Sequence, residues 1–379
     1  MSNYTHEVSD MLKECFDGIT DGRQASKVRH NLLEIVLMTI CAIIAGCDAW
    51  EDIADFCRVK ESWLRERLGL KLENGIPSHD TFSRVWSMIE PEELNRRFKQ
   101  WVGTISEATE QEIVSIDGKT LRRSGSDEQK PLHMISAWAS KQQLVLGQTA
   151  TDAKSNEITA VPELLDMLDV AGCIVTADAM SCQKAIVAKI AEKQADYAIG
   201  LKDNQPMLRK ATEEYFEAFL NDPKLYRDVT KIETIDKGHG RIEVRTYYLT
   251  AKIDWLDVKD AWAGLQSLGM VRSKVTCDGK ETEDTRYYIS SITDIKTFAT
   301  AVRSHWGIEN SLHWCLDMTF SEDYCRMRKD HSAENIAIVR HIALNVLKTF
   351  PANMSVARKR RRCTYDDQFL ADVLLSIHA

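Results

Sequence analysis

Two short apolar runs, each closed by an aspartate, constrain the fold of this chain more than any other feature. Residues 113–116 lead into Asp117, and residues 173–177 lead into Asp178. Apolar runs of about 4–8 residues are typical of buried strands. A carboxylate at the end of a buried strand is held rigidly while its oxygens face solvent, which suits hard cations such as Mg²⁺. We expect both aspartates to be metal ligands.

The pattern around these aspartates predicts a layered α/β domain. The expected elements are, in order, strands at 113–117, 133–139 and 143–151, a helix at 157–168, a strand at 173–178, a helix at 182–193 and a strand at 197–201. This is the order of an RNase H-like layer, in which the first and fourth strands lie side by side. Their carboxyl ends would bring Asp117 and Asp178 together despite their separation in the chain.

The chain before this domain is helical in pattern, and we expect an all-α N-terminal domain at 1–105. The expected helices are at 30–46, 50–57 and 61–68, with a fourth capped by Ser78 and a fifth opened by Pro91. Basic residues on the short helices leave two alternatives. One is a helix-turn-helix that enters a DNA major groove, and the other is a packing or dimerisation module.

The RNase H-like domain is expected at 110–350, with a β-rich insertion at about 205–292. Four strands are expected there, at 229–236, 242–250, 270–277 and 285–292, with turns at 238–240 and 277–280. The remaining residues, 351–379, contain five consecutive cations at 358–362. We expect a solvated basic tail that adds nonspecific DNA affinity.

A third acidic residue, Glu309, follows the insertion in a helical stretch. On an α-helix it would share a half-buried stripe with His305 and His313. Two carboxylates at strand ends and a third on a helix can bracket two divalent metals about 3.5–4 Å apart. A separate His-x3-Glu-x3-His zinc site is the alternative, although the spacing is not that of standard zinc sites. We expect Trp306 and Trp314 to pack this helix, with stacking on bases as the other possibility.

Composition narrows the class of protein further. The net charge of −8 argues against a uniformly basic coat, so contact with nucleic acid must use local patches. The ten cysteines contain no C-x-x-C pair and predict reduced thiols in the cytoplasm. Acidic residues precede any hydrophobic stretch at the N-terminus, unlike a signal peptide. The apolar run at 32–47 contains Glu34 and is shorter than the roughly 18 residues of a membrane span. No membrane association is expected.

Four strings carry a resemblance to a known family. They are SIDGKT at 115–120, TADAM at 176–180 with Cys182 and Gln183, GLKDNQ at 200–205, and HWGIEN at 305–310 with LHW at 312–314. They resemble DDE-class insertion-sequence transposases, and among these the H-repeat-associated transposases found beside Rhs elements. The resemblance covers nearly the whole chain.

The resemblance implies a DNA transposase with Asp117, Asp178 and Glu309 as catalytic triad and metal ligands. Such an enzyme binds the inverted-repeat ends of its element, cleaves DNA by metal-dependent phosphodiester hydrolysis, and joins the 3′-hydroxyl ends to target DNA. Mg²⁺ is the implied metal, for which Mn²⁺ can substitute, and a homodimer on double-stranded DNA is implied. Two alternatives remain open: a metal-dependent nuclease without strand transfer, and a non-catalytic DNA-binding remnant of a mobile element.

One departure from the family pattern concerns the residues around Glu309. Related transposases often carry a Tyr and an Arg seven and four residues before the glutamate, and a Lys seven after it. Here these positions hold Val302, His305 and Leu316, so the DNA-clamping role of that signature does not transfer. Other polar side chains near the three acids could contact DNA or be solvated surface groups. The candidates are Lys119, Arg122, Lys202, Asn204, Arg303, His305, His313, Arg326 and Arg328.

Overall fold

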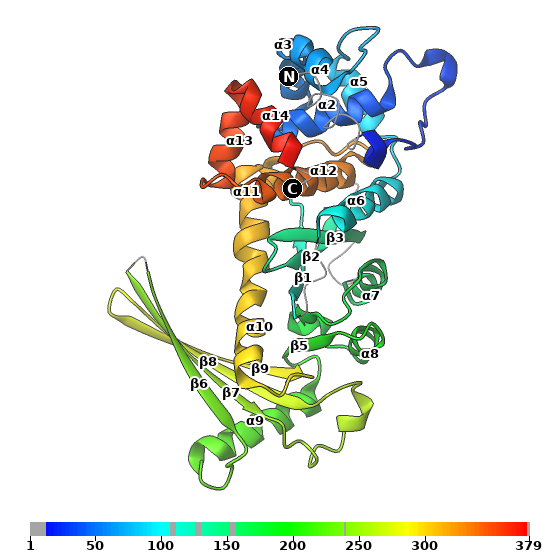
Figure 1. The fold of residues 1–379 in the computed structure, drawn as a ribbon. Helices are drawn as coiled ribbons and strands as arrows, with labels where there is room; N and C mark the ends of the chain where they lie inside the picture. Colours follow the sequence, from blue (N-terminus) through cyan, green and yellow to red (C-terminus); the bar gives the residue numbers. More distant parts are fainter. Residues whose placement is uncertain (1–12, 107–110, 126–129, 152–156, 239, 377–379) are drawn as a thin grey trace.

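The protein is built on one nine-stranded sheet with helices at both ends and on both faces (Figure 1). The computed structural model describes residues 13–106, 111–125, 130–151, 157–238 and 240–376. The strands are β1 (Ile113–Thr120), β2 (His133–Ala139), β3 (Leu144–Thr151), β4 (Ile174–Ala177), β5 (Asp196–Leu201), β6 (Thr230–Gly238), β7 (Arg241–Thr250), β8 (Ser267–Cys277) and β9 (Lys280–Ser290). Their order in the sheet is β3-β2-β1-β4-β5-β9-β8-β7-β6.

The predicted pairing of the first and fourth strands is confirmed. β1 and β4 run parallel, and Ile116 opposite Ala177 is their last pair. The expected end of the first strand at Asp117 is wrong, however. β1 continues to Thr120 because it pairs with β2 over three further residues, from Gly118 opposite Ile135 to Thr120 opposite His133. From Asp117 onward, β1 therefore extends beyond its last pair with β4. Because β4 ends first, the side chain of Asp117 is open to a cavity.

Helices cover the two faces of this half of the sheet. The expected helices are present as α7 (Glu157–Met167) and α8 (Lys184–Glu192), whose apolar sides pack with Val114, Val175 and Ile199. The opposite face is covered by α10 (Ile295–Gly307), which buries Phe298 against residues of β1, β4 and β5. Alternate residues of a strand face opposite sides, so one set of β1 side chains faces α7 and the other faces α10.

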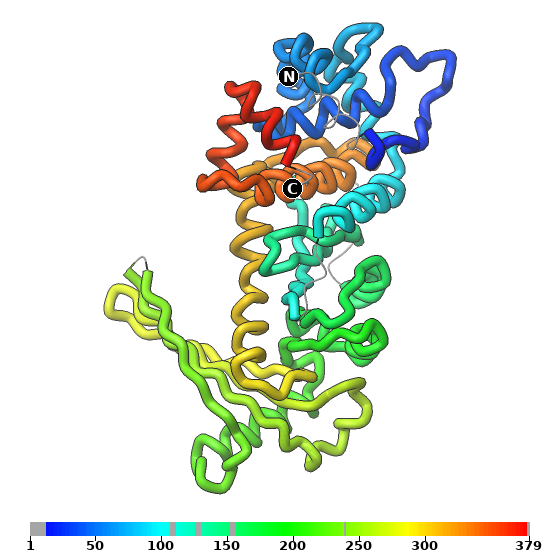
Figure 2. Tube along the Cα trace, viewed as in Figure 1, coloured from blue at the N-terminus to red at the C-terminus, as the bar shows by residue number. Residues whose placement is uncertain are grey.

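The expected β-rich insertion is present and extends the same sheet. It begins with α9 (Pro206–Asn221) and continues with β6 to β9, which match the four predicted strands to within a few residues. β9 pairs antiparallel with β5, and the insertion projects from the body as a long arm (Figure 2). Its second turn is confirmed: Asp278 and Gly279 have φ values of 49° and 74°, as a two-residue hairpin loop requires. The first turn includes His239, which lies outside the described residues.

The N-terminal helices agree with the prediction. They are α2 (Leu32–Ile44), α3 (Trp50–Val59), α4 (Glu61–Leu68), α5 (His79–Trp86) and α6 (Pro91–Ile105). Ser78 caps α5 because its side chain accepts a hydrogen bond from the backbone N–H of Thr81. α2 is the buried helix expected from its sequence. Within the part of the chain that the structure describes, no helix combines the length and apolarity needed to cross a bilayer.

These helices do not form a core of their own. α12 (Ser332–Thr349), α13 (Val356–Tyr365) and α14 (Asp367–Leu375) share one hydrophobic core with α2 to α6 (Figure 1). The buried side chain of Asn335 in α12 donates hydrogen bonds to the carbonyls of Trp86 and Ile89 at the end of α5. The expected boundary that assigned residues up to 350 to the sheet domain is therefore revised, since α12 belongs to the helical core.

The expectation of a solvated basic tail at 351–379 is wrong for the described part of that segment. Arg360 is 4% exposed, its Nη2 lies 2.5 Å from Oδ1 of Asp48, and its Nε donates to the carbonyl of Ile43. Lys359 is also buried and donates to the carbonyl of Leu347, whereas Arg361 is exposed. The basic run forms α13, and two of its five cations bind α13 to the helical core.

Candidate active site

The three acidic residues predicted as a triad line one cavity of about 830 Å³. Asp117 projects from β1, and Asp178 follows β4 directly. Glu309 lies on η5 (Ile308–His313), a π-helix that joins α10 to α11 (Trp314–Thr319) without a break. Three segments far apart in the sequence thus contribute one carboxylate each to the same cavity wall.

Asp117 is followed by glycine because the space beside Gly118 is occupied. A Cβ at position 118 would lie 2.4 Å from Nε2 of His133 and 2.6 Å from Oε1 of Glu157, closer than atoms can approach. Those two buried side chains pair with each other at 2.5 Å. This pair was not predicted, because nothing in the sequence spacing of His133 and Glu157 connects them to the Asp-Gly-Lys string.

The turn that carries Asp178 is held by the GLKDNQ string. Oδ1 of Asp178 accepts the backbone N–H groups of Met180 and Ser181, which opens the short helix η3 (Ala179–Ser181). Gly200 lets β5 approach this turn, since a Cβ there would lie 3.1 Å from the backbone nitrogen of Ala179. Nδ2 of Asn204 donates to the carbonyl of Ala179 at 2.8 Å. Asn204 was predicted to contact DNA, but its amide is used to hold this turn.

Glu309 lies on a π-helix, whereas the sequence predicted an α-helix. Ile308 and Leu312 are buried and Glu309 is exposed, so the carboxylate lies on the solvent side of the stripe that packs on the sheet. Single π-turns within α-helices are frequent at functional sites. His305 and His313 are partly exposed and line the same cavity as Glu309, in agreement with the half-buried stripe predicted from the sequence.

The electrostatics of the cavity are dominated by its carboxylates. Burial and, to a smaller extent, the nearby Glu309 and Asp178 carboxylates raise the pKa of Asp117 to about 7, while the backbone N–H of Gly118 acts to lower it. Like charges at short range disfavour the ionised form of each other. The carboxylates of Glu309 and Asp178 therefore disfavour the ionised form of Asp117.

This raised pKa predicts a pH dependence of stability for the metal-free protein. Between about pH 4 and 7 the folded state binds more protons at Asp117 than the unfolded state does, so stability falls as the pH rises through this window. Asp117→Asn removes the effect and should make the protein more stable than wild type at pH 7.5, by up to roughly 4 kcal/mol. Urea unfolding at pH 5 and 7.5 measures the free energy of unfolding of both proteins. The prediction is contradicted if the difference between Asp117→Asn and wild type does not grow with pH.

The donor chemistry of this cavity suits a hard cation. Asp117, Asp178 and Glu309 offer carboxylate oxygens, which are the ligands preferred by Mg²⁺, and the raised pKa of Asp117 reflects charge that a cation would offset. Among the described residues, however, no three His, Cys, Asp or Glu side chains are gathered closely enough to hold an ion as they stand. Binding would require the carboxylates to turn toward a common point in the cavity.

The two histidines near Glu309 are partly buried and neutral. Nδ1 of His305 lies 3.2 Å from Oγ1 of Thr176, and burial lowers the pKa of His305 to about 4. Nδ1 of His313 lies 3.6 Å from Oδ2 of Asp117, and burial lowers the pKa of His313 to about 3. Both were predicted to contact DNA. The structure places His305 against β4 and His313 beside Asp117.

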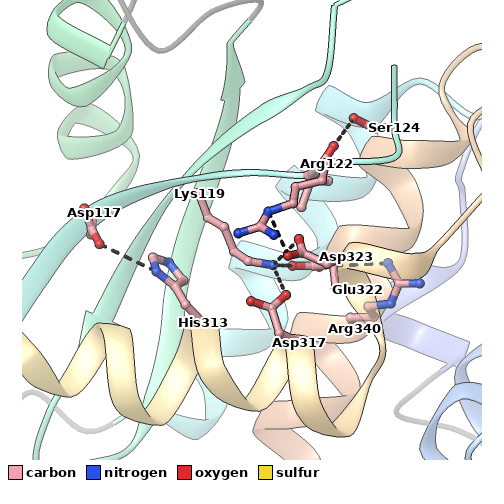
Figure 3. Close-up of polar contacts among 10 residues, drawn as sticks. Asp117, Lys119, Arg122, Ser124, His313, Asp317, Glu322, Asp323 and Arg340 are labelled. Atoms are coloured by element: carbon pink, nitrogen blue, oxygen red, sulfur yellow. Dashed lines mark hydrogen bonds and ion pairs between the residues drawn. The ribbon is translucent and has the colours of Figure 1, made fainter. Parts of the chain in front are cut away.

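Lys119 also has a different environment from the one predicted. Its Nζ lies 2.5 Å from Asp317, 2.6 Å from Glu322 and 3.6 Å from Asp323, and Glu322 faces Arg340 at 3.9 Å (Figure 3). Burial alone would lower the pKa of Lys119, but Glu322 and Asp317 raise it above its usual range. The ammonium group of Lys119 is thus held by carboxylates of the protein while it lines the cavity, and its predicted contact with DNA stays a prediction.

Comparison with known proteins assigns the chain to a family. The family described as "Transposase DDE domain" matches residues 108–346, and the one described as "DDE_Tnp_1-associated" matches residues 13–102. The chain belongs to the DDE transposase family. The prediction made from the four strings is confirmed, and all three acidic residues fall within the matched DDE domain.

Relatives of this DDE transposase family member align over almost its full length. It is 43% identical to "H repeat-associated putative transposase YhhI" of Escherichia coli (strain K12), over 96% of this chain and 97% of the relative. It is 40% identical to "Putative transposase YncI" of Escherichia coli O157:H7, over 94% of this chain and 93% of the relative. A piggyBac transposase in a synaptic complex with hairpin DNA aligns with a TM-score of 0.42 at 11% identity, over 97% of this chain and 79% of that one, which is too distant to support an inference.

The remaining basic residues that were predicted to contact DNA in this transposase family member form two groups: those that line the cavity and those that do not. Arg122 and Lys202 line the cavity and are exposed. Arg303 pairs with Asp236 at 3.5 Å outside it, and Arg326 and Arg328 are exposed but do not line it. Two cations missed by sequence analysis, Arg209 of α9 and Arg286 of β9, complete the cavity wall. No local sequence signal distinguishes these two from other arginines in the insertion.

The expectation that Trp306 and Trp314 pack the Glu309 helix is wrong. Trp306 is 36% and Trp314 60% exposed, and the guanidinium of Arg286 lies 4.6 Å from the ring centroid of Trp306. The buried stripe of this helix is filled by Ile308 and Leu312 instead. Trp306 lines the cavity, whereas Trp314 is exposed and does not line it.

Proposed function

We propose that this protein is a DNA transposase that cleaves DNA at the inverted-repeat ends of its element and joins the 3′-hydroxyl ends to target DNA. The observation that carries the proposal is the meeting of Asp117, Asp178 and Glu309 in one cavity of a DDE family domain. The order and directions of β3-β2-β1-β4-β5 support an RNase H-like assignment for the layer that holds them.

Asp117, Asp178 and Glu309 would hold Mg²⁺, or Mn²⁺ in its place. Bound there, the metal would stabilise the charge that develops at phosphorus and on the attacking and leaving oxygens of an in-line displacement. The protein contributes a rigid frame for these ligands: strand β1 fixes Asp117, the capped turn fixes Asp178, and the packed helix fixes Glu309. Contacts that fix the side chains of metal ligands in this way keep those ligands in the geometry that catalysis requires.

Cleavage and joining are two phosphoryl transfers at one site. Water attacks in the first, and the DNA 3′-hydroxyl released by it attacks in the second, so no covalent enzyme intermediate is required. Arg122 and Lys202 are exposed at the cavity, and we propose that they contact the phosphates of double-stranded DNA. We propose a homodimer on DNA, since cleavage and joining require two ends held together.

Strand joining distinguishes this function from that of a nuclease. The full-length protein should join pre-nicked element ends to a supercoiled target plasmid in the presence of Mg²⁺, giving products that migrate above the free ends on a denaturing gel. Cutting of intact ends without any joined product would favour a nuclease. Binding of ends without cutting or joining would favour a non-catalytic DNA-binding remnant.

A further inference from the structure

The helix that carries Glu309 is tied to the sheet by polar contacts on both sides of that residue. α10, η5 and α11 form one continuous helix across the face of β1 and β4, where Ile113, Ile174 and Val302 belong to one hydrophobic cluster. Because alternate residues of a strand share a face, Asp117 and Lys119 project from β1 on this same side. The helix and the aspartates therefore meet across one surface.

Glu309 has no contact of its own that fixes it. Its side chain is exposed, and among the described residues no hydrogen bond or ion pair holds its carboxylate. Its position relative to Asp117 and Asp178 consequently depends on how the helix backbone is placed. The contacts that place this backbone thus decide where the third carboxylate lies.

The tie before Glu309 connects the helix to β4. His305, about one turn upstream, places Nδ1 at 3.2 Å from Oγ1 of Thr176, and that hydroxyl donates to Oγ of Ser115 at 3.1 Å. Thr176 lies two residues before Asp178, and Ser115 lies two residues before Asp117. This chain of three polar groups binds the helix to both aspartate-bearing strands at once.

The tie after Glu309 connects the helix to β1. Asp317, about two turns downstream in α11, pairs with Nζ of Lys119, which lies two residues after Asp117. The same ammonium pairs with Glu322, whose side chain is only 2% exposed. Buried ions held by several partners resist displacement, because separating them leaves uncompensated charge in a medium of low dielectric constant.

We propose that Lys119 and His305 are positioning residues that hold Glu309 at a fixed distance from Asp117 and Asp178. The inference rests on the proposed function, since a fixed distance matters when the three carboxylates share metal ions. Lys119 acts through the helix and is shielded by Asp317, Glu322 and Asp323, while His305 acts through Thr176. Both side chains line the cavity and act on the ligand set through these contacts.

Mn²⁺ binding to the full-length protein tests the proposal without DNA or turnover. Electron paramagnetic resonance of free Mn²⁺ gives the affinity of wild type, Lys119→Met and Lys119→Arg. We expect Lys119→Met to weaken Mn²⁺ binding roughly 10–100-fold, the effect typical of contacts that orient metal ligands. Lys119→Arg keeps the positive charge among the three carboxylates and should restore most of the affinity.

Two further variants separate positioning from general stability. His305→Leu removes the other tie without leaving a buried charge, and should also weaken Mn²⁺ binding even if Lys119→Met fails to fold. Thr39→Val removes the buried hydrogen bond from Nε1 of Trp86, lowers stability within the N-terminal helices, and should bind Mn²⁺ with wild-type affinity in its folded state. Wild-type affinity in folded Lys119→Met or His305→Leu would overturn the inference, as would equal losses in Thr39→Val.

Asp117→Asn distinguishes failure of this inference from failure of the proposed function. If Asp117→Asn loses Mn²⁺ while the positioning variants keep it, the triad stands and only the positioning role is overturned. If wild type and Asp117→Asn bind Mn²⁺ equally, the proposed metal site is overturned, and the positioning role with it.

Discussion

Asp117→Asn should abolish metal-dependent nicking and joining of element ends while leaving end binding largely intact. The substitution keeps the shape of the side chain but removes the charge of one of the three carboxylates of the proposed triad. Loss of one preorganised electrostatic group at a reacting centre typically costs about 10²–10³-fold in rate, and loss of a metal ligand should cost at least as much. Gel assays of nicking and of strand transfer measure the effect, and a mobility-shift assay measures end binding.

A matched substitution on the same cavity wall supplies the control. Asp284 also lines the cavity, but it lies on β9 and its carboxylate accepts from Nε of Arg286 at 2.7 Å. Asp284→Asn should change the joining rate by no more than a few-fold, since it is not one of the three converging acids. Strand transfer retained by Asp117→Asn would refute the triad.

Arg360→Met should destabilise the fold by about 3 kcal/mol, near the lower end of the range for breaking a buried ion pair. The guanidinium is buried, pairs with Asp48, donates to two backbone carbonyls of other elements, and lies 4.4 Å from the ring centroid of Phe320. Asp48 is 29% exposed and can regain water, which limits the loss. Urea unfolding monitored by circular dichroism measures the change.

The adjacent cation in the same basic run provides the comparison. Arg361 is exposed, and surface substitutions usually change stability by less than about 0.5 kcal/mol. Arg361→Met should therefore unfold at nearly the wild-type urea concentration. Equal effects of the two substitutions would mean that the run behaves as the solvated tail expected from its sequence.

Local pattern was sufficient to predict most of the strands and helices. Runs such as 113–116 and 173–177 are apolar because both faces of their strands are covered, and the Asp278 and Gly279 turn adopts the positive φ values that these residues tolerate. The adjacency of β1 and β4 followed from the order of elements, because few topologies accommodate that order. Asp117 and Asp178 were expected to meet for the same reason, whereas Glu309 was added to them through the family resemblance.

Features that depend on distant partners could not be predicted. Lys119 follows an active-site aspartate and reads as a surface cation, yet its partners Asp317 and Glu322 come some 200 residues later. Trp306 and Trp314 were expected to pack the helix that carries Glu309, but Ile308 and Leu312 fill its buried face. In both cases the deciding contact lies outside the window in which a sequence pattern is read.

The core shared by α2 to α6 with α12 to α14 has a consequence for synthesis of the protein. The first helices leave the ribosome long before α12, whose Asn335 and apolar side chains fill their core. At about 5–20 residues per second, the delay is on the order of tens of seconds. During that time the early helices expose an apolar surface that α12 later covers. If translation stops within the β-rich insertion, the released chain lacks α12, cannot complete this core, and is a substrate for chaperones and proteases.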